Sequence, residues 1–300
     1  MKQAVMLVMI MALATLVAAQ TQTPPAQSTP AQSKPAQAGT APAQPPQGKR
    51  PPQAKTQAEF DAYKAATANT TDPAAMEKAA DDFAAKFPES ELRILLYRAA
   101  MHGYQTANKA DQMMEMGRKV LKIDPDDPEA LVGVAQVLAE RTRDTDLDKD
   151  QRLDEGTKLA QHAVETADTD ITVPPGTPQE KIDQYKGFLR SNAYYVLGTI
   201  QYTREKYGDA ESYFHKSLDA YPSQPDPLAV LRLALSLDKQ EKYPEALKFA
   251  NQAVQMTEGN QGNSTLANLA RNERDRLIQL TGGTPASKPP ASAQNPPPKN

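Results

Sequence analysis

The densest group of side chains able to hold an ion lies in an acidic segment in the middle of the chain, residues 144–155. Its carboxylates follow one another at nearly alternate positions: Asp144, Asp146, Asp148, Asp150, Asp154 and Glu155. Oxygen atoms are the ligands that Ca²⁺ prefers, and roughly six to eight of them surround the ion. This segment is therefore the strongest candidate in the sequence for an ion-binding site.

The spacing resembles the twelve-residue loop of the EF-hand family, which uses side-chain oxygens at positions 1, 3, 5 and 12. That resemblance implies a set of calcium ligands: Asp144, Asp146, Asp148, Asp150 and Glu155. Two positions depart from the family, because Lys149 stands where the loop needs glycine and Gln151 where it has an apolar residue. The competing interpretation, which we adopt, is a solvated acidic loop in which Lys149 and Arg152 neutralise carboxylates.

The remaining chemistry-bearing residues do not form a recognisable catalytic or metal motif. His102, His162 and His215 are far apart in the sequence, and we expect none of them to bind a metal. The absence of cysteine rules out disulfides, thiolate metal sites and thiol nucleophiles. Neither a G-x-S-x-G nor an H-E-x-x-H motif nor a phosphate-binding glycine loop is present. The sequence thus predicts a non-enzyme without a cofactor.

Residues 1–19 have the pattern of a secretory signal. Lys2 is followed by an almost wholly apolar run, and Val17-Ala18-Ala19 forms a small-residue cleavage site. The run is shorter than the roughly 20 apolar residues that span a bilayer, although an uncleaved anchor remains the alternative. We expect a periplasmic or secreted protein with no stable membrane insertion after cleavage.

Composition separates a central body from two tails. Residues 20–56 and 281–300 contain 15 of the 26 prolines and no acidic residue, so we expect both to be disordered. The body, 57–280, holds 27 Lys and Arg against all 37 Asp and Glu, a net charge of −10. Nucleic-acid binding is not expected, because it requires a basic surface.

The clearest structural unit covers residues 191–224, within a body whose apolar residues recur with helical period throughout. Its key positions are Tyr194, Leu197, Gly198, Ala210, Phe214 and Pro222. They resemble the 34-residue tetratricopeptide repeat, W-x2-L-G-x2-Y, then A-x3-F, then P, although Gln201 replaces the second tyrosine. Gly198 and Ala210 would let two antiparallel helices cross closely, and Phe214 would fill the gap between them.

Weaker copies of the unit extend over the body. They lie at about 57–90, 94–127, 128–167 (with an insertion at 142–152) and 227–260. Residues 171–190 do not fit and are interpreted as an adaptor with its own helix ending at Leu189. Residues 264–280 are predicted to form a capping helix, with Leu269 on its apolar side. The fold class is therefore an all-α, tetratricopeptide-like helix-turn-helix solenoid with disordered Pro-rich tails.

The resemblance implies a function as well as a fold. First helices of such repeats line a concave groove that binds an extended or helical peptide. Carried over position by position, the groove residues are Arg98, His102, Val132, Gln136, Asn192, Tyr195, Thr199, Tyr202, Leu231 and Leu235. We therefore expect a non-catalytic scaffold that binds a protein or peptide. For Tyr195 and Tyr202, packing between repeats is the alternative role, and for the whole chain the alternatives are a calcium-responsive module or an envelope spacer acting through its tails.

Overall fold

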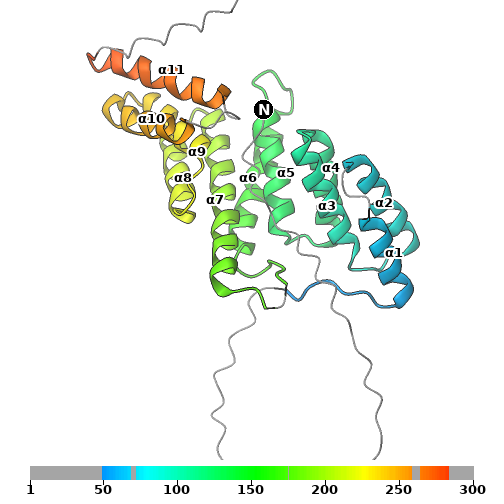
Figure 1. Ribbon diagram of the computed structural model, residues 1–300. Coiled ribbons are helices and arrows are strands. Elements are labelled where there is room, and N and C mark those ends of the chain that lie inside the picture. The colour runs from blue at the N-terminus through cyan, green and yellow to red at the C-terminus, as the bar shows by residue number, and fades with distance from the viewer. Residues whose placement is uncertain (1–48, 69–71, 175, 259–263, 284–300) are drawn as a thin grey trace, which may run out of the picture.

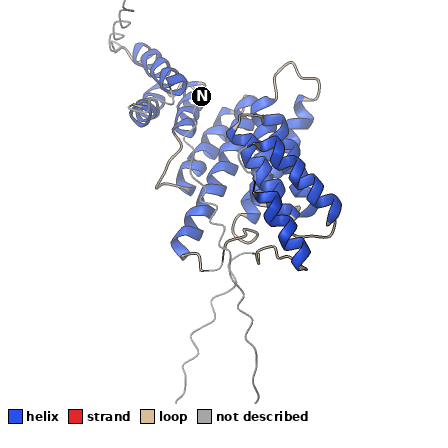
Figure 2. Cartoon of the chain, turned by 45° about the vertical axis from the view of Figure 1, so that its right-hand side comes forward, coloured by secondary structure: helices blue, strands red, loops and turns tan. Residues whose placement is uncertain are grey.

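The computed structural model describes residues 49–68, 72–174, 176–258 and 264–283, in which eleven helices follow one another in a curved row (Figure 1). In Figure 2 these described residues are helices and loops. An isolated bridge between Lys49 and Thr172 is the one β interaction among them. The helices are α1 Gln57–Thr67, α2 Pro73–Lys86, α3 Arg93–Thr106, α4 Ala110–Ile123, α5 Pro128–Arg141, α6 Lys149–Thr166, α7 Gln179–Thr203, α8 Tyr207–Ala220, α9 Pro227–Asp238, α10 Tyr243–Thr257 and α11 Ser264–Leu280. The signal at 1–19 and most of both tails lie outside the described residues.

The helices pack as successive pairs, which confirms the all-α solenoid. Each odd-numbered helix from α1 to α9 packs on the even-numbered helix that follows it, and α11 packs on α10. In addition, α5 contacts α7, and α9 contacts both α7 and α11. The first helices of neighbouring pairs therefore line one common side of the stack, called here the inner face. Among the described helices, none is long and apolar enough to cross a membrane.

Three helices begin at the dipeptide Asp-Pro. Asp72, Asp127 and Asp226 are the N-caps of α2, α5 and α9, and each side chain accepts a hydrogen bond from a backbone N–H in the first turn. The proline that follows costs little there, because its missing N–H belongs to the turn in which N–H groups have no helical partner. These dipeptides fix where the chain turns back into the stack.

The crossing of α7 and α8 has the geometry that the repeat pattern predicts. Ala210 and Phe214 are fully buried. A Cβ atom added to Gly198 would lie 2.7 Å from the ring of Phe214, well inside the contact distance of two carbon atoms. Glycine is thus required at this point because the aromatic ring fills the space beside the helix backbone.

The adaptor prediction is wrong in one respect: residues 179–203 form a single helix, with no break near 190. Gly187 alone does not interrupt it, and its Cα packs so closely on the end of α8 that an added Cβ would lie 2.7 Å from the carbonyl oxygen of Ala220. Ile182 and Leu189 are buried with Ala167 and Ile171 in a small cluster. Residues 179–190 therefore extend α7, the first helix of the fourth pair, at its N-terminal end.

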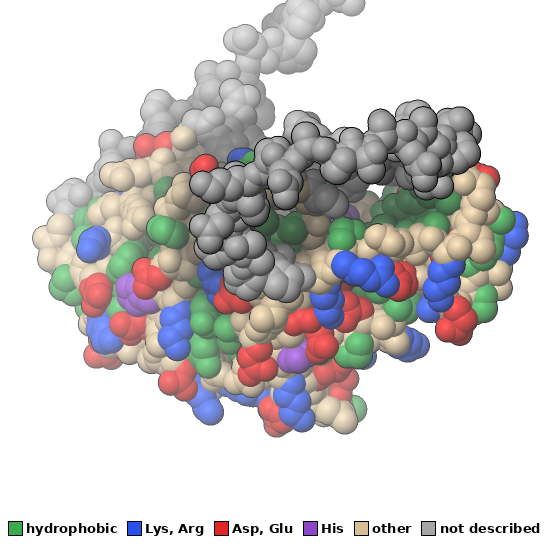
Figure 3. Space-filling model, turned by 90° about the horizontal axis from the view of Figure 1, so that it is seen from below, with side chains coloured by type: hydrophobic (Ala, Val, Ile, Leu, Met, Phe, Trp, Pro, Cys, Tyr) green, Lys and Arg blue, Asp and Glu red, His purple; other side chains and the backbone are tan. Residues whose placement is uncertain are grey.

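Residues 49–56 are ordered, which corrects the predicted boundary at 56. This segment, the strap, runs along the lower edge of the stack (Figure 1). Lys49 Nζ lies 2.8 Å from Asp124 Oδ1 and 2.9 Å from Asp170 Oδ1, and Arg50 pairs with Glu91 at 2.6 Å. Seen from below, acidic and basic side chains are intermingled over this face (Figure 3). Basic residues of the linker are thus held by acidic loops of the body.

Leu269, predicted on the apolar side of the capping helix, is exposed, and so is Phe60 in the terminal helix at the other end of the stack. Phe60 of α1 is 41% exposed and Leu269 of α11 is 53% exposed, whereas Ala267 and Ala270 of α11 are buried. A terminal helix has a neighbour on one side only, so part of its apolar surface stays uncovered.

We predict that Gly198→Ala destabilises the protein, whereas Gly208→Ala does not. Both residues are helical, so alanine gains up to ~1 kcal/mol of helix propensity at each. At Gly198 the clash with the buried Phe214 ring costs ~1–3 kcal/mol, whereas the Cβ at Gly208 meets only a side-chain oxygen at 3.7 Å. Urea unfolding should show a destabilised Gly198→Ala and an unchanged or stabilised Gly208→Ala. Equal shifts of the same sign would contradict this crossing.

The strap should contribute measurably to stability through Lys49. We expect Lys49→Ala to lower the free energy of unfolding by ~1 kcal/mol, the upper end for partly exposed pairs, and the loss should shrink at high salt. Lys78→Ala is the matched control, because Lys78 pairs with Asp82 at 2.7 Å on the open surface of α2. Its effect should stay below ~0.5 kcal/mol. A Lys49→Ala loss no larger than that of the control would mean that the strap does not hold the stack.

Candidate binding face

The ten predicted groove residues all lie on first helices, but their exposure divides them into two groups. Six are partly exposed: Arg98 and His102 on α3, Gln136 on α5, Asn192 and Tyr202 on α7, and Leu235 on α9. Four are buried: Val132, Tyr195, Thr199 and Leu231.

The buried group packs between neighbouring helices. Tyr195 lies against Phe214, with ring centroids 5.9 Å apart, and burial raises its pKa to about 12. Val132 packs with Ala163 and Ala193, while Leu231 packs in a cluster with Ala253 and Ala270. Burial therefore removes these four side chains from the accessible surface of the inner face, and for Tyr195 it favours the packing role.

In the lower part of the inner face, an ion pair joins α3 to the start of α5. Arg98 Nε donates to Asp127 Oδ2 at 2.6 Å, and Asp127 is fully buried. The other oxygen of Asp127 accepts from the backbone N–H of Ala130 at 2.9 Å. One carboxylate thus caps α5 and fixes α3 beside it. Removing either partner of such a buried pair leaves a charge without compensation.

A second polar contact joins three first helices just beside this pair. His102 Nε2 lies 3.1 Å from Glu129 Oε2, and the Tyr185 hydroxyl donates to Glu129 Oε1. Burial on its own lowers the pKa of His102, but the hydrogen bond and charge of Glu129 outweigh it and raise the pKa above its ordinary 6.5. These polar groups are occupied with one another, so Arg98 and His102 serve the packing of α3, α5 and α7.

The upper part of the inner face presents a different arrangement. Arg232 of α9 lies over the ring of Tyr202, with its Cζ 5.7 Å from the ring centroid, and Tyr207 packs edge-on against Tyr202 at 5.3 Å. In the part of the chain that the structure describes, Arg232 forms no ion pair. Leu235 is partly exposed one turn further along α9. Sequence reasoning missed Arg232 because it is not at a groove position of the repeat.

The acidic segment does not form a calcium loop. Helix α6 begins at Lys149, so Asp150 and Glu155 are helical instead of belonging to a twelve-residue loop. The carboxylates also diverge: Asp144 pairs with Lys149 at 2.8 Å, Asp146 accepts from the N–H of Arg143, and Glu155 pairs with Arg118 of α4. This arrangement favours the solvated acidic loop over the calcium interpretation with Asp144, Asp146, Asp148, Asp150 and Glu155. Of the two neutralising residues expected, Lys149 does so, whereas Arg152 donates to the hydroxyl of Thr142.

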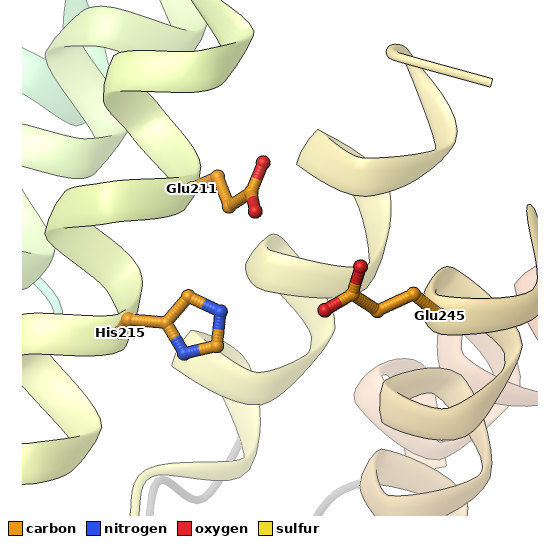
Figure 4. A group of neighbouring side chains, drawn as sticks. All are labelled: Glu211, His215 and Glu245. Atoms are coloured by element: carbon orange, nitrogen blue, oxygen red, sulfur yellow. The ribbon is translucent and has the colours of Figure 1, made fainter. Parts of the chain in front are cut away.

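One histidine does have carboxylates beside it in a converging arrangement, contrary to expectation. His215 lies four residues after Glu211 on α8, and Glu245 of α10 approaches both (Figure 4). Two signals in the sequence point to this group. One is the i, i+4 spacing, and the other is that Glu211 and Glu245 stand one 34-residue repeat apart.

No family model and no curated protein matches this chain. Among solved structures it is similar to PilW, described as a widely conserved type IV pilus biogenesis factor, with 18% identity over 75% of this chain and 99% of that one (TM-score 0.45). BtubC from P. vanneervenii is 14% identical over 82% of this chain and 100% of that one (TM-score 0.42). Yeast Tom70 is 15% identical over 77% of this chain and 47% of that one (TM-score 0.41). The fold assignment rests on the helix pairs themselves.

The contact between His102 and Glu129 predicts a pH-dependent contribution to stability. Because folding raises the pKa of His102, its stabilising effect is complete below the unfolded value near ~6.5 and is lost as pH rises through the folded value. The groups that face it are Glu129, Arg98 and Asp127. We expect the urea midpoint of His102→Gln to fall below that of the parent at pH 5.5–6 and to approach it by pH 9. A gap that widens with pH would refute this sign.

Proposed function

We propose that this chain is an exported, non-catalytic scaffold that binds a protein or peptide on the upper inner face of its helix stack. The observation that carries the proposal is the arrangement of Arg232 over Tyr202. Arginine and tyrosine dominate the energetics of many protein interfaces, because each combines a flat apolar surface with polar atoms at its edge. Leu235 adds an apolar contact beside them.

The charges of the inner face support this location. Arg98 and His102 already interact with Asp127 and Glu129 within the chain. Arg232, by contrast, is half-buried against an aromatic ring and forms no ion pair with the described residues. A partner could supply a carboxylate that pairs with Arg232 and an apolar side chain that covers Leu235. An acidic, partly apolar peptide is therefore the kind of partner that fits.

A binding role without catalysis agrees with the chemistry of this face. The titratable groups of its lower part hold helices together, and its upper part offers contact surface instead of a nucleophile paired with a base. The body carries a net charge of −10, which disfavours a nucleic-acid partner.

Export is part of the proposal and is supported by the sequence pattern of residues 1–19. We expect the mature protein to begin near Gln20 and to be recovered in the periplasmic or secreted fraction. N-terminal sequencing together with cell fractionation checks this. A cytosolic protein that retains Met1 would contradict it.

The binding face is tested by reversing one charge on each side of the stack. Arg232→Glu should weaken capture of specific partners from envelope extract by at least ~30-fold, the effect of a hot-spot residue worth ~2 kcal/mol. Lys216→Glu is the matched control, because Lys216 of α8 also lies over a tyrosine ring, 5.1 Å from the centroid of Tyr213, but on a second helix.

Quantitative mass spectrometry of the captured proteins provides the readout, and unchanged melting midpoints confirm that both variants fold. Partners lost with Arg232→Glu and kept with Lys216→Glu support the inner face. The opposite pattern assigns binding to the second helices, and partners kept by both variants exclude the Arg232 site.

A further inference from the structure

The group of Glu211, His215 and Glu245 lies outside the proposed binding face, on the second helices α8 and α10. Each residue offers one ligand atom, and the three atoms lie within 4.8 Å of one another. Figure 4 shows the imidazole and both carboxylates directed toward a common region between the two helices. Two elements of successive pairs thus contribute to one potential coordination sphere.

Neighbouring side chains orient two of these three groups. The ring of His215 packs edge-on against Phe249, with centroids 5.5 Å apart and ring planes at 76°. Glu211 Oε2 accepts hydrogen bonds from Gln240 Nε2 at 2.7 Å and Lys242 Nζ at 2.8 Å. Neither bond uses Oε1, so the second oxygen stays available while the first is held. The uncharged contact from Gln240 is of the kind that fixes the geometry of ligands in metal sites.

We propose that Glu211, His215 and Glu245 bind a divalent transition-metal ion, with Zn²⁺ as the preferred occupant. One imidazole nitrogen and two carboxylate oxygens match zinc, which binds both donor types at about 2.0–2.2 Å. Calcium and magnesium prefer oxygen ligands alone and gain little from imidazole. With three protein ligands, water completes the coordination, as in open zinc sites.

Two features of the surroundings are compatible with an ion. The two carboxylates supply two negative charges, which balance a divalent cation. Lys242 is close, but its pair with Glu211 is partly exposed, with 45% of the lysine side chain accessible. Exposed pairs of this kind contribute only ~0–1 kcal/mol, so the lysine can move aside at small cost. The ion would then link the fourth and fifth helix pairs.

His162 is the natural control, because it also lies beside two carboxylates. There, however, Asp126 approaches Nε2 at 2.7 Å and Glu165 approaches Nδ1 at 3.5 Å. The carboxylates face opposite ring nitrogens, so they cannot converge on one ion with the imidazole. His162 thus has the same kinds of neighbours as His215, but their ligand atoms do not point to one position. His162→Gln therefore tests whether zinc binding depends on the arrangement of the ligands and not merely on their presence.

The experiment is a zinc titration of the full, tag-free, chelator-treated chain by calorimetry, with melting midpoints in parallel. The parent should bind one Zn²⁺ per chain and melt at a higher temperature with zinc, because an ion that binds the folded state stabilises it. Magnesium and calcium at equal concentration should have no such effect. His215→Gln and Glu245→Gln should each lower zinc affinity at least tenfold, and His162→Gln should leave it unchanged.

Glu245 is exposed, so Glu245→Gln keeps the test valid if the His215 variant is unstable without metal. The proposal is overturned if the parent does not bind zinc, if binding survives in the Glu245 variant, or if His162→Gln lowers affinity as much as His215→Gln does.

Discussion

The close approach of neighbouring helices, both within a pair and between pairs, at positions that admit only glycine or alanine is the constraint on which the rest of the structure depends. Gly198 faces the ring of Phe214, and an added Cβ at Gly117 would lie 2.7 Å from a methyl group of Val134. Helices that cross this closely form thin layers, which lets the first helices of successive pairs contact one another. Tyr195 is buried against Phe214 of α8, and Leu231 is buried with Ala253 of α10 and Ala270 of α11. The accessible inner face is consequently restricted to a smaller area around Tyr202, Arg232 and Leu235.

Charged side chains fix those positions of helices and loops that apolar packing does not determine. Asp127 caps α5 and holds Arg98 of α3, so one carboxylate sets both the start of a helix and its distance from the next. Glu129 connects His102 to Tyr185 on the extension of α7. At the lower edge, Lys49 joins two loops through Asp124 and Asp170. These groups form ion pairs within the chain, whereas Arg232 forms none with the described residues, which makes Arg232 a candidate contact for an external partner.

The sequence predicts the helix pairs well, because Gly198, Ala210 and Phe214 lie within one local pattern whose physical role is evident from residue size. Prediction from the sequence fails where a structural feature depends on contacts between residues that are far apart in the chain. The strap appears disordered from its composition, yet Lys49 interacts with acidic residues far along the chain. The burial of Leu231 depends in part on Ala270 of α11, which lies outside its own helix pair. Glu211 and Glu245 become neighbours only when equivalent positions of two repeats are placed side by side.

The central claim is that a partner binds the upper inner face, and site-specific photo-crosslinking tests it most directly. A photoreactive amino acid placed at Leu235 on the inner face is compared with the same group at Leu147, which is fully exposed in the loop between α5 and α6. The account predicts that Leu235 gives crosslinks to a defined protein or peptide and that Leu147 gives none to it. Crosslinks to the same partner from Leu147 and none from Leu235 would contradict it.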